Sequence, residues 1–320
     1  MMRAFRVPMA VRFRGVDART GVLVQGAHGW GEFSPFPEYP AEACGRWAAA
    51  AGEAASVAWP AAARDRIPVN VTVPAVGPTQ AHALVRASGC ATAKVKIAEA
   101  GQTEADDVAR VEAVRDALGP AGYLRVDVNA VWDVATAARR LAALARFDLQ
   151  YAEQPVATLV EMAELRRAVP VPLAVDESIR TAADPLAVAS QLRPGTPHGI
   201  EAADVVVLKV QPLGGVHAAL RVAEACGLPV VVSSALETSI GLAAGVALAA
   251  ALPELPYACG LATARLLAGD VVAEPLADRG GYLDVRRPPV DEIALAAFQL
   301  DGPKAEAQIR RFTVAAEAGA

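Results

Sequence analysis

Short hydrophobic runs alternate with longer amphipathic segments along most of the chain from residue 68 onward. The short runs are rich in β-branched residues, and the segments between them carry Ala, Leu and Arg at helical spacing. This alternation predicts βα units and a parallel sheet. Eight βα units are typical of a (β/α)8-type barrel. The predicted strands are residues 69–73, 93–97, 124–128, 150–153, 173–176, 205–209, 230–233 and 257–259.

The two ends of the chain depart from this pattern. Segments 12–15, 21–24 and 29–33 indicate a small antiparallel sheet, which a proline-rich loop and a helix at 41–58 follow. The tail contains one short strand, 282–285, and a final helix. We therefore expect an α/β protein with two domains. The expected domains are a capping α+β domain at 1–66 plus 281–320, and a barrel at 67–280.

Composition narrows the classes of protein that need to be considered. The 320 residues carry a net charge of −5 with both signs dispersed, so no basic block is available for a nucleic acid. The longest apolar run, 240–252, is shorter than the about 20 residues that a membrane span needs. The four cysteines form no CxxC pair, which favours a reducing cytoplasm. Oligomeric state stays open.

Carboxylates stand at the ends of three consecutive predicted strands: Asp127, Glu153 and Asp176. Taken singly, Asp127 could form a turn or cap a helix, and a salt bridge could satisfy Glu153. In a closed barrel, however, the carboxyl ends of the strands meet on the face where active sites lie. Three adjacent carboxylates stay ionised only with a cation among them. Oxygen ligands favour Mg²⁺, for which Mn²⁺ can substitute.

Lysines flank this set, with Lys94 and Lys96 on the strand before it and Lys209 on the strand after it. Lysines often protect exposed edge strands, but a closed barrel has no edge, so that explanation weakens here. A carboxylate substrate bound to a divalent cation becomes acidic at its α-carbon, and a lysine can remove the proton. The pattern predicts metal-assisted proton abstraction, with Lys96 and Lys209 on opposite sides of a small-molecule carboxylate.

This ordered set resembles the enolase superfamily, and within it the muconate-lactonising-enzyme subgroup. The resemblance rests on the Lys-x-Lys pair, the three carboxylates, the sixth-strand lysine, and Gly-Trp-Gly-Glu at 29–32. It implies a modified TIM barrel of (β/α)7β type with a capping domain, and Mg²⁺ bound by the three carboxylates. It further implies Lys96 as acid/base and Lys209 as a cation on the opposite face. Loops 15–21 and 34–39 are expected to close over the substrate.

Within the subgroup, the resemblance implies dehydration of 2-succinyl-6-hydroxy-2,4-cyclohexadiene-1-carboxylate to 2-succinylbenzoate, a step of menaquinone biosynthesis. Helix capping is the alternative for two serines in the implied substrate site. An N-succinylamino acid racemase or a cycloisomerase would use the same lysines and carboxylates, whereas a non-catalytic ligand-binding barrel would need none of them. The residues with implied substrate-binding or supporting places are Lys94, Arg125, Asn129, Ser233, Ser234 and Gly260.

Overall fold

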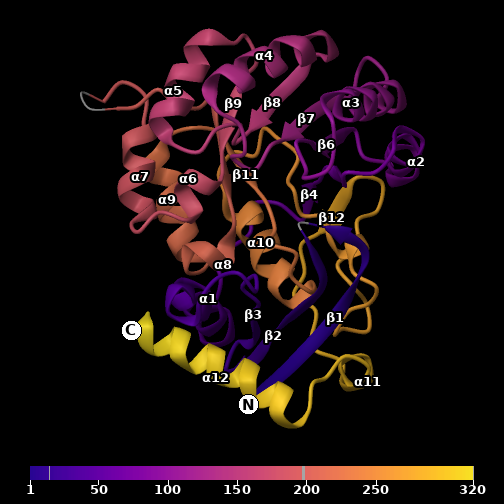
Figure 1. Ribbon diagram of the computed structural model, residues 1–320. Helices are drawn as coiled ribbons and strands as arrows, with labels where there is room; N and C mark the ends of the chain where they lie inside the picture. Colours follow the sequence, from indigo (N-terminus) through magenta and orange to yellow (C-terminus); the bar gives the residue numbers. More distant parts are fainter. Residues whose placement is uncertain (14, 197–198, 320) are drawn as a thin grey trace.

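The computed structural model describes residues 1–13, 15–196 and 199–319. Seven parallel strands form a curved central sheet in the order β11-β10-β9-β8-β7-β6-β5 (Figure 1). Each of the seven overlaps a predicted strand, which confirms the α/β barrel-type fold. The strands are β5 (Val71–Val73), β6 (Thr92–Lys96), β7 (Tyr123–Asp127), β8 (Leu149–Glu153), β9 (Leu173–Val175), β10 (Val205–Leu208) and β11 (Val230–Val232).

The eighth predicted strand, 257–259, is not a regular strand, and that detail of the prediction was wrong. The segment nevertheless joins the two edges of the sheet. The backbone N–H of Cys259 donates to the carbonyl of Pro68 (2.7 Å), and that of Gly260 donates to the carbonyl of Val232 at the other edge (2.8 Å). A single residue paired with each edge is too little for a ladder, so isolated bridges close the barrel.

Helices connect successive strands and cover the sheet (Figure 1). Thr103 caps the helix that starts at Glu104, because its side chain and that of Asp106 each accept a hydrogen bond from the other's backbone N–H. No helix in the described part of the chain is long and apolar enough to cross a bilayer. The helices are α2 (Pro78–Ser88), α3 (Glu104–Leu118), α4 (Val134–Leu144), α5 (Leu159–Ala168), α6 (Glu177–Arg180), α7 (Pro185–Leu192), α8 (Val210–Leu213), α9 (Val216–Cys226) and α10 (Ser239–Ala251), with 3-10 turns η2 (Ala145–Phe147) and η3 (Ala264–Leu266).

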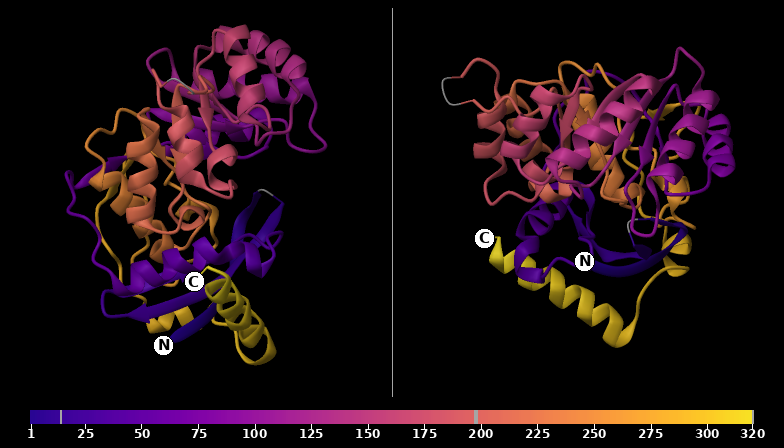
Figure 2. Two further views of the ribbon diagram at one scale, coloured as in Figure 1. Left: turned by 90° about the vertical axis from the view of Figure 1, so that its left-hand side faces the viewer. Right: turned by 45° about the horizontal axis from the view of Figure 1, so that its top comes forward.

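Both termini lie on one side of the barrel. Helix α12 lies on the face of the capping elements that points away from the barrel (Figures 1 and 2). The antiparallel sheet has the order β1-β2-β3. The segment 15–21 lies mostly in β2, because Ala18 and Thr20 pair with Pro8 and Arg6 of β1, so the expectation of a loop there was wrong. Its closure over the substrate stays a prediction. The elements are β1 (Met2–Phe13), β2 (Val16–Gly26), β3 (Gly29–Phe33), η1 (Ala41–Cys44), α1 (Gly45–Ser56), β4 (Arg66–Pro68), β12 (Tyr282–Asp284), α11 (Glu292–Ala296) and α12 (Gly302–Ala318).

A buried carboxylate joins the capping sheet to the barrel. Glu32, in β3, accepts hydrogen bonds from Thr238 Oγ1 (2.5 Å) and from the Gly241 backbone N–H (3.0 Å) at the start of α10. Ser34 Oγ donates to the same carboxylate (2.6 Å). Burial raises the pKa of Glu32 to about 7, although the hydrogen bonds from Ser34 and Thr238 oppose the rise. The contact fixes where the 34–39 loop leaves the sheet.

Candidate active site

Strand register brings the predicted lysines and carboxylates together. Lys96 lies beside Asp127 in the pairing of β6 with β7, and Asp127 lies beside Glu153 in the pairing of β7 with β8. Alternate residues of a strand share a face, so Lys94 points the same way as Lys96. The predicted lysines and carboxylates therefore gather towards the carboxyl ends of the strands. Deeper in the barrel lies an apolar cluster: Tyr151, Ala174, Val205, Val207 and Val231.

Lys94 is shared between two carboxylates. Its Nζ lies 3.0 Å from both oxygens of Glu153 and 3.0 Å from Asp127 Oδ2. All three side chains are buried. Burial alone would lower the pKa of Lys94, but Asp127 and Glu153 raise it well above its ordinary value. Lys94 is therefore suited to neutralise charge rather than to accept a proton.

Lys96 has two polar partners at the end of β7. Its Nζ donates to Asp127 Oδ2 (2.6 Å) and to Asn129 Oδ1 (2.5 Å), and lies 5.6 Å from the centre of the Phe13 ring. Asn129 has a left-handed backbone (φ 53°), a conformation that asparagine tolerates better than most residues. Although burial opposes the shift, Lys94 and Lys96 hold the pKa of Asp127 below its usual range.

Asp176 is held from two sides. Lys209, which follows β10, donates to Oδ2 (2.5 Å), and Arg180 at the end of α6 donates to Oδ1 through Nε (3.1 Å). Burial would raise the pKa of Asp176, but Lys209 and Arg180 lower it to about 2. Lys209 therefore stands on the wall formed by β9 and β10, whereas Lys96 stands on the wall formed by β6 and β7.

The three carboxylates have lysine counter-ions and do not share one centre. Within residues 1–13, 15–196 and 199–319, no three His, Cys, Asp or Glu side chains gather closely enough to hold a metal ion. Two features nevertheless fit a hard divalent cation. Asp127 Oδ1 is buried without a hydrogen-bond partner among the described groups. Burial, followed by the charge of Asp127, raises the pKa of Glu153 to about 7. A cation bound to these oxygens would give Asp127 Oδ1 a partner and would stabilise the ionised form of Glu153.

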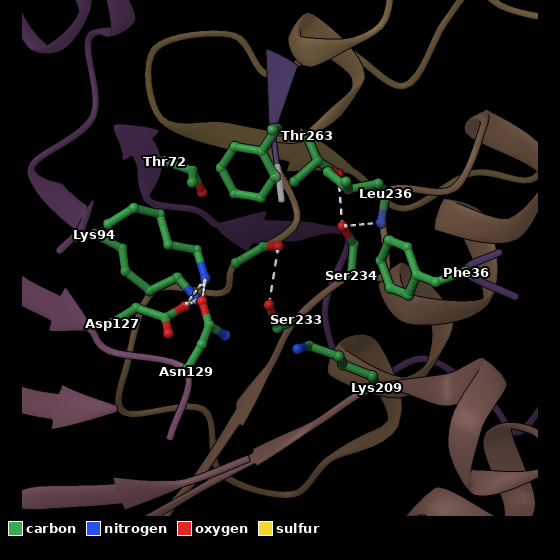
Figure 3. A pocket seen from close by; sticks show the side chains of 13 residues that line it. Phe36, Thr72, Lys94, Asp127, Asn129, Lys209, Ser233, Ser234, Leu236 and Thr263 are labelled. Atoms are coloured by element: carbon green, nitrogen blue, oxygen red, sulfur yellow. Dashed lines mark hydrogen bonds and ion pairs between the residues drawn. The ribbon is translucent and has the colours of Figure 1, made fainter. Parts of the chain in front are cut away.

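A pocket opens above this cluster, between the barrel and the capping elements. Figure 3 shows Lys94 and Asp127 on one side of it, and Lys209 reaching in from another strand end. The pocket thus presents lysines from two different walls to whatever it binds. Its lining residues are Phe13, Phe36, Thr72, Lys94, Lys96, Asp127, Asn129, Lys209, Ser233, Ser234, Leu236, Gly260 and Thr263.

The remaining predicted residues divide between the pocket and the barrel interior. Ser233, Ser234 and Gly260 line the pocket, and Ser234 Oγ lies 2.7 Å from Thr263 Oγ1. The helix that follows the serines, α10, has Thr238 as its N-cap. Arg125, Glu153 and Asp176 are buried beneath the pocket and are not part of its lining.

Arg125 lies on β7 two residues before Asp127, one layer of side chains deeper in the barrel. Its guanidinium donates to Gln150 Oε1 (2.7 Å) and to the Ala258 carbonyl (2.8 Å), and stacks 4.7 Å from the centre of the Tyr151 ring. In this structure it ties β7 to β8 and to the segment that closes the barrel.

Sequence reasoning missed several residues of the site. Phe13 and Phe36 line the pocket from the capping elements, and the signal available for Phe36 was its place in a loop expected to close over substrate. Thr72 is on β5. Only the alternation of inward-facing and outward-facing residues along that strand could have identified it from the sequence. Arg180 had a local signal in its spacing of four and three residues from Asp176 and Glu177, whereas its contact with Tyr39 joins distant segments.

The family models match both parts of the chain. Residues 78–289 match the description "Enolase C-terminal domain-like" and residues 4–55 match "Enolase N-terminal domain-like". The solved structure of muconate lactonizing enzyme from Pseudomonas fluorescens, complexed with muconolactone, is similar with a TM-score of 0.79. That likeness covers 93% of this chain and 98% of the other at 23% identity, and concerns the fold. Fold and family matches define the class, an enolase-type barrel enzyme.

Sequence relatives narrow the class further. A protein named o-succinylbenzoate synthase from Thermobifida fusca is 64% identical over 299 residues, which cover 93% of this chain and 92% of that one. A protein of the same name from Mycobacterium tuberculosis is 52% identical, over 91% of this chain and 86% of that one. The chain therefore belongs to the o-succinylbenzoate synthase family of the enolase superfamily, and the predicted resemblance is confirmed.

Proposed function

We propose that this enzyme dehydrates 2-succinyl-6-hydroxy-2,4-cyclohexadiene-1-carboxylate to 2-succinylbenzoate, as a Mg²⁺-dependent step of menaquinone biosynthesis. The observation that carries the proposal is a pocket with Lys96 and Lys209 on its walls, in a chain 64% identical to a protein named for this product. Carboxylates in contact with both lysines give the pocket the charge pattern that the reaction needs.

Asp127, Glu153 and Asp176 are the residues that would hold Mg²⁺, with Mn²⁺ as a substitute. When bound, the ion supplies positive charge for the substrate carboxylate as the adjacent proton leaves. Lys94, Lys96 and Lys209 now neutralise these carboxylates. They become available to the substrate only when another cation takes over that task.

Lys96 is assigned the proton transfers. An ammonium group cannot accept a proton, so Lys96 acts as the base in its neutral amine form, after its 2.6 Å contact with Asp127 has opened and its extra proton has left. It then removes the proton at C1 of the ring. As the bond from C6 to the hydroxyl breaks, the same lysine returns the proton to that hydroxyl, which leaves as water. The electron pair of the broken C–H bond completes the aromatic ring of the product.

Lys209 is assigned a different task on the opposite wall. The charge that builds on the substrate during proton removal needs a nearby cation, and Lys209 can provide it without transferring a proton. Ser233, Ser234, Gly260 and Asn129 are assigned to substrate contact, because they line the same pocket. Lys94 and Arg125 are assigned supporting places.

A turnover assay with two substrates tests this proposal. The purified enzyme with Mg²⁺ should convert the cyclohexadiene carboxylate to 2-succinylbenzoate and should invert an N-succinylamino acid more slowly. Because both lysines line the pocket, two-base racemisation is the alternative that the geometry allows. Inversion as fast as dehydration would give the racemase equal standing, and no dehydration at all would refute the proposal.

Three further predictions belong to this proposal. All four cysteines are buried and free, which suits a reducing compartment, and we propose a cytoplasmic location. We propose a small-molecule carboxylate as the binding partner. The division into a capping domain at 1–66 plus 281–320 and a barrel at 67–280 stays a prediction, and the two separate family matches support it.

A further inference from the structure

A chain of hydrogen bonds connects the capping loop, residues 34–39, to the barrel. The hydroxyl of Tyr39 accepts a hydrogen bond from Arg180 Nη1 (2.8 Å). The same guanidinium donates through Nη2 to Glu177 Oε1 (2.6 Å) and through Nε to Asp176 Oδ1 (3.1 Å). Three different N–H groups of one buried side chain thus reach the loop residue Tyr39 and two consecutive residues at the start of α6.

Each branch of this series of hydrogen bonds ends at a lysine of the pocket, one at Lys209 and the other at Lys96. Through Asp176, Arg180 is connected to Lys209, which donates to the other oxygen of the same carboxylate (2.5 Å). The second branch runs through Glu177, whose Oε1 also accepts from Asn129 Nδ2 (3.0 Å). Asn129 Oδ1 in turn accepts from Lys96 Nζ (2.5 Å).

The loop at the outer end of the chain carries part of the pocket wall. Phe36 lines the pocket, three residues before Tyr39. Arg311 of α12 donates to the backbone carbonyls of Phe36 (2.8 Å) and Tyr39 (2.7 Å) and so holds the loop from outside. The hydroxyl of Tyr39 holds it from the barrel side. The position of Phe36 is therefore fixed between the C-terminal helix and Arg180.

We propose that Arg180 and Tyr39 are positioning residues that couple the closed capping loop to the orientation of Lys96 and Lys209. The inference rests on the proposed function of those lysines. Arginine suits this place because its planar fork offers several donors in fixed directions, whereas a lysine ammonium cannot reach all three partners together. Closure of the loop and alignment of the lysines then become one event.

Packing of the Tyr39 ring is the competing explanation. The ring centre lies 6.4 Å from that of Phe36 and 6.2 Å from that of Trp47, so the residue could serve only as an apolar contact. Tyr39→Phe keeps the ring and removes the hydroxyl, which separates the two explanations. Tyr123→Phe is the matched control, because Tyr123 is exposed at the start of β7, away from the pocket.

The experiment is a double-mutant cycle with Tyr39→Phe, Arg180→Lys and both together, read by kcat/KM for dehydration. Tyr39→Phe should lower kcat/KM about tenfold, the size expected for one hydrogen bond to a charged group. Arg180→Lys should lower it about 100-fold, and adding Tyr39→Phe to it should change little more, because the partner is already lost. Additive losses, or a Tyr39→Phe variant equal to wild type and to Tyr123→Phe, would overturn the inference.

A second measurement does not depend on the reaction. Amide hydrogen exchange over residues 34–39 should be faster in Tyr39→Phe and in Arg180→Lys than in wild type, and unchanged in Tyr123→Phe. If wild-type enzyme fails to dehydrate the substrate, the proposed function is refuted and the exchange comparison alone decides the coupling. Unchanged exchange at 34–39 in both variants overturns the coupling even where dehydration is confirmed.

Discussion

Removing the positive charge of Lys94 should leave the carboxylates of Asp127 and Glu153 without their shared counter-ion. Lys94 lies 3.0 Å from Glu153 and 3.0 Å from Asp127, all three being buried. Lys94→Met keeps most of the side-chain volume but leaves two neighbouring carboxylates without their common counter-ion. We expect the variant to be destabilised most strongly when no divalent cation is present.

The size of the effect follows from the distances. At 3.0 Å and an effective dielectric constant of about 20, each ion pair is worth roughly 5–6 kcal/mol before relaxation. Measured losses on breaking a buried pair are about 3–5 kcal/mol. We expect a loss of that size in the free energy of unfolding, with chelator present and at pH 8. Lys94 lowers the pKa of Glu153, which is about 7 with the lysine present, so its removal raises that pKa further. Protonation of Glu153 then takes up part of the unpaired charge, and a loss of that size is the upper limit.

Urea unfolding followed by far-ultraviolet circular dichroism measures this loss. Lys304→Met, a substitution on the exposed face of α12, is the control for removal of one positive charge. Saturating Mg²⁺ should restore more than half of the lost stability, because a cation bound to the carboxylates replaces Lys94 as their counter-ion. The reasoning is refuted if Lys94→Met costs no more than Lys304→Met, or if Mg²⁺ leaves the difference between Lys94→Met and wild type unchanged.

Three further predictions concern the metal, the second lysine and the junction with the capping sheet. Exhaustive chelation should abolish turnover and added Mg²⁺ should restore it, so full activity in chelator would contradict the metal assignment. Lys209→Arg keeps the charge but not the single short contact with Asp176, and kcat should fall at least about tenfold; a wild-type kcat would count against that assignment. Because burial raises the pKa of Glu32 from 4.5 to about 7, the folded state binds the extra proton between these values. Stability should therefore decline by roughly 3 kcal/mol from this group as pH rises from 4.5 to 7. Urea unfolding of Glu32→Gln should show a correspondingly flatter profile, and an unchanged slope would refute this cause.

The barrel was predictable because its signals are local. A β-branched run of about five residues followed by an amphipathic helix marks each βα unit, whatever lies elsewhere in the chain. The strand-end positions of Asp127, Glu153 and Lys209 followed from the same pattern. The segment at 257–259 misled because a run so short bridges each edge of the sheet with a single residue. The hairpin β1–β2 was underestimated because Pro8, which usually interrupts strands, is accommodated within the pairing.

The partners of the charged groups could not be read from the sequence. Strand spacing places Lys94 on the same face as Lys96, but only the register between strands shows that Lys94 lies between two carboxylates. The link between Tyr39 and Arg180 spans 141 positions of the chain, and no periodicity encodes it. Contacts of this kind depend on how the capping loop is seated on the barrel.

The central claim is that Lys96 removes the proton while Lys209 supplies charge from the opposite wall. Its most direct test is deuterium exchange from solvent into C1 of an unreactive analogue that lacks the leaving hydroxyl, with wild type, Lys96→Ala and Lys209→Ala. We predict that exchange is lost in Lys96→Ala, by about 10²–10⁴-fold, and persists at a reduced rate in Lys209→Ala. Exchange that survives in Lys96→Ala and vanishes in Lys209→Ala would contradict the account and reverse the two assignments.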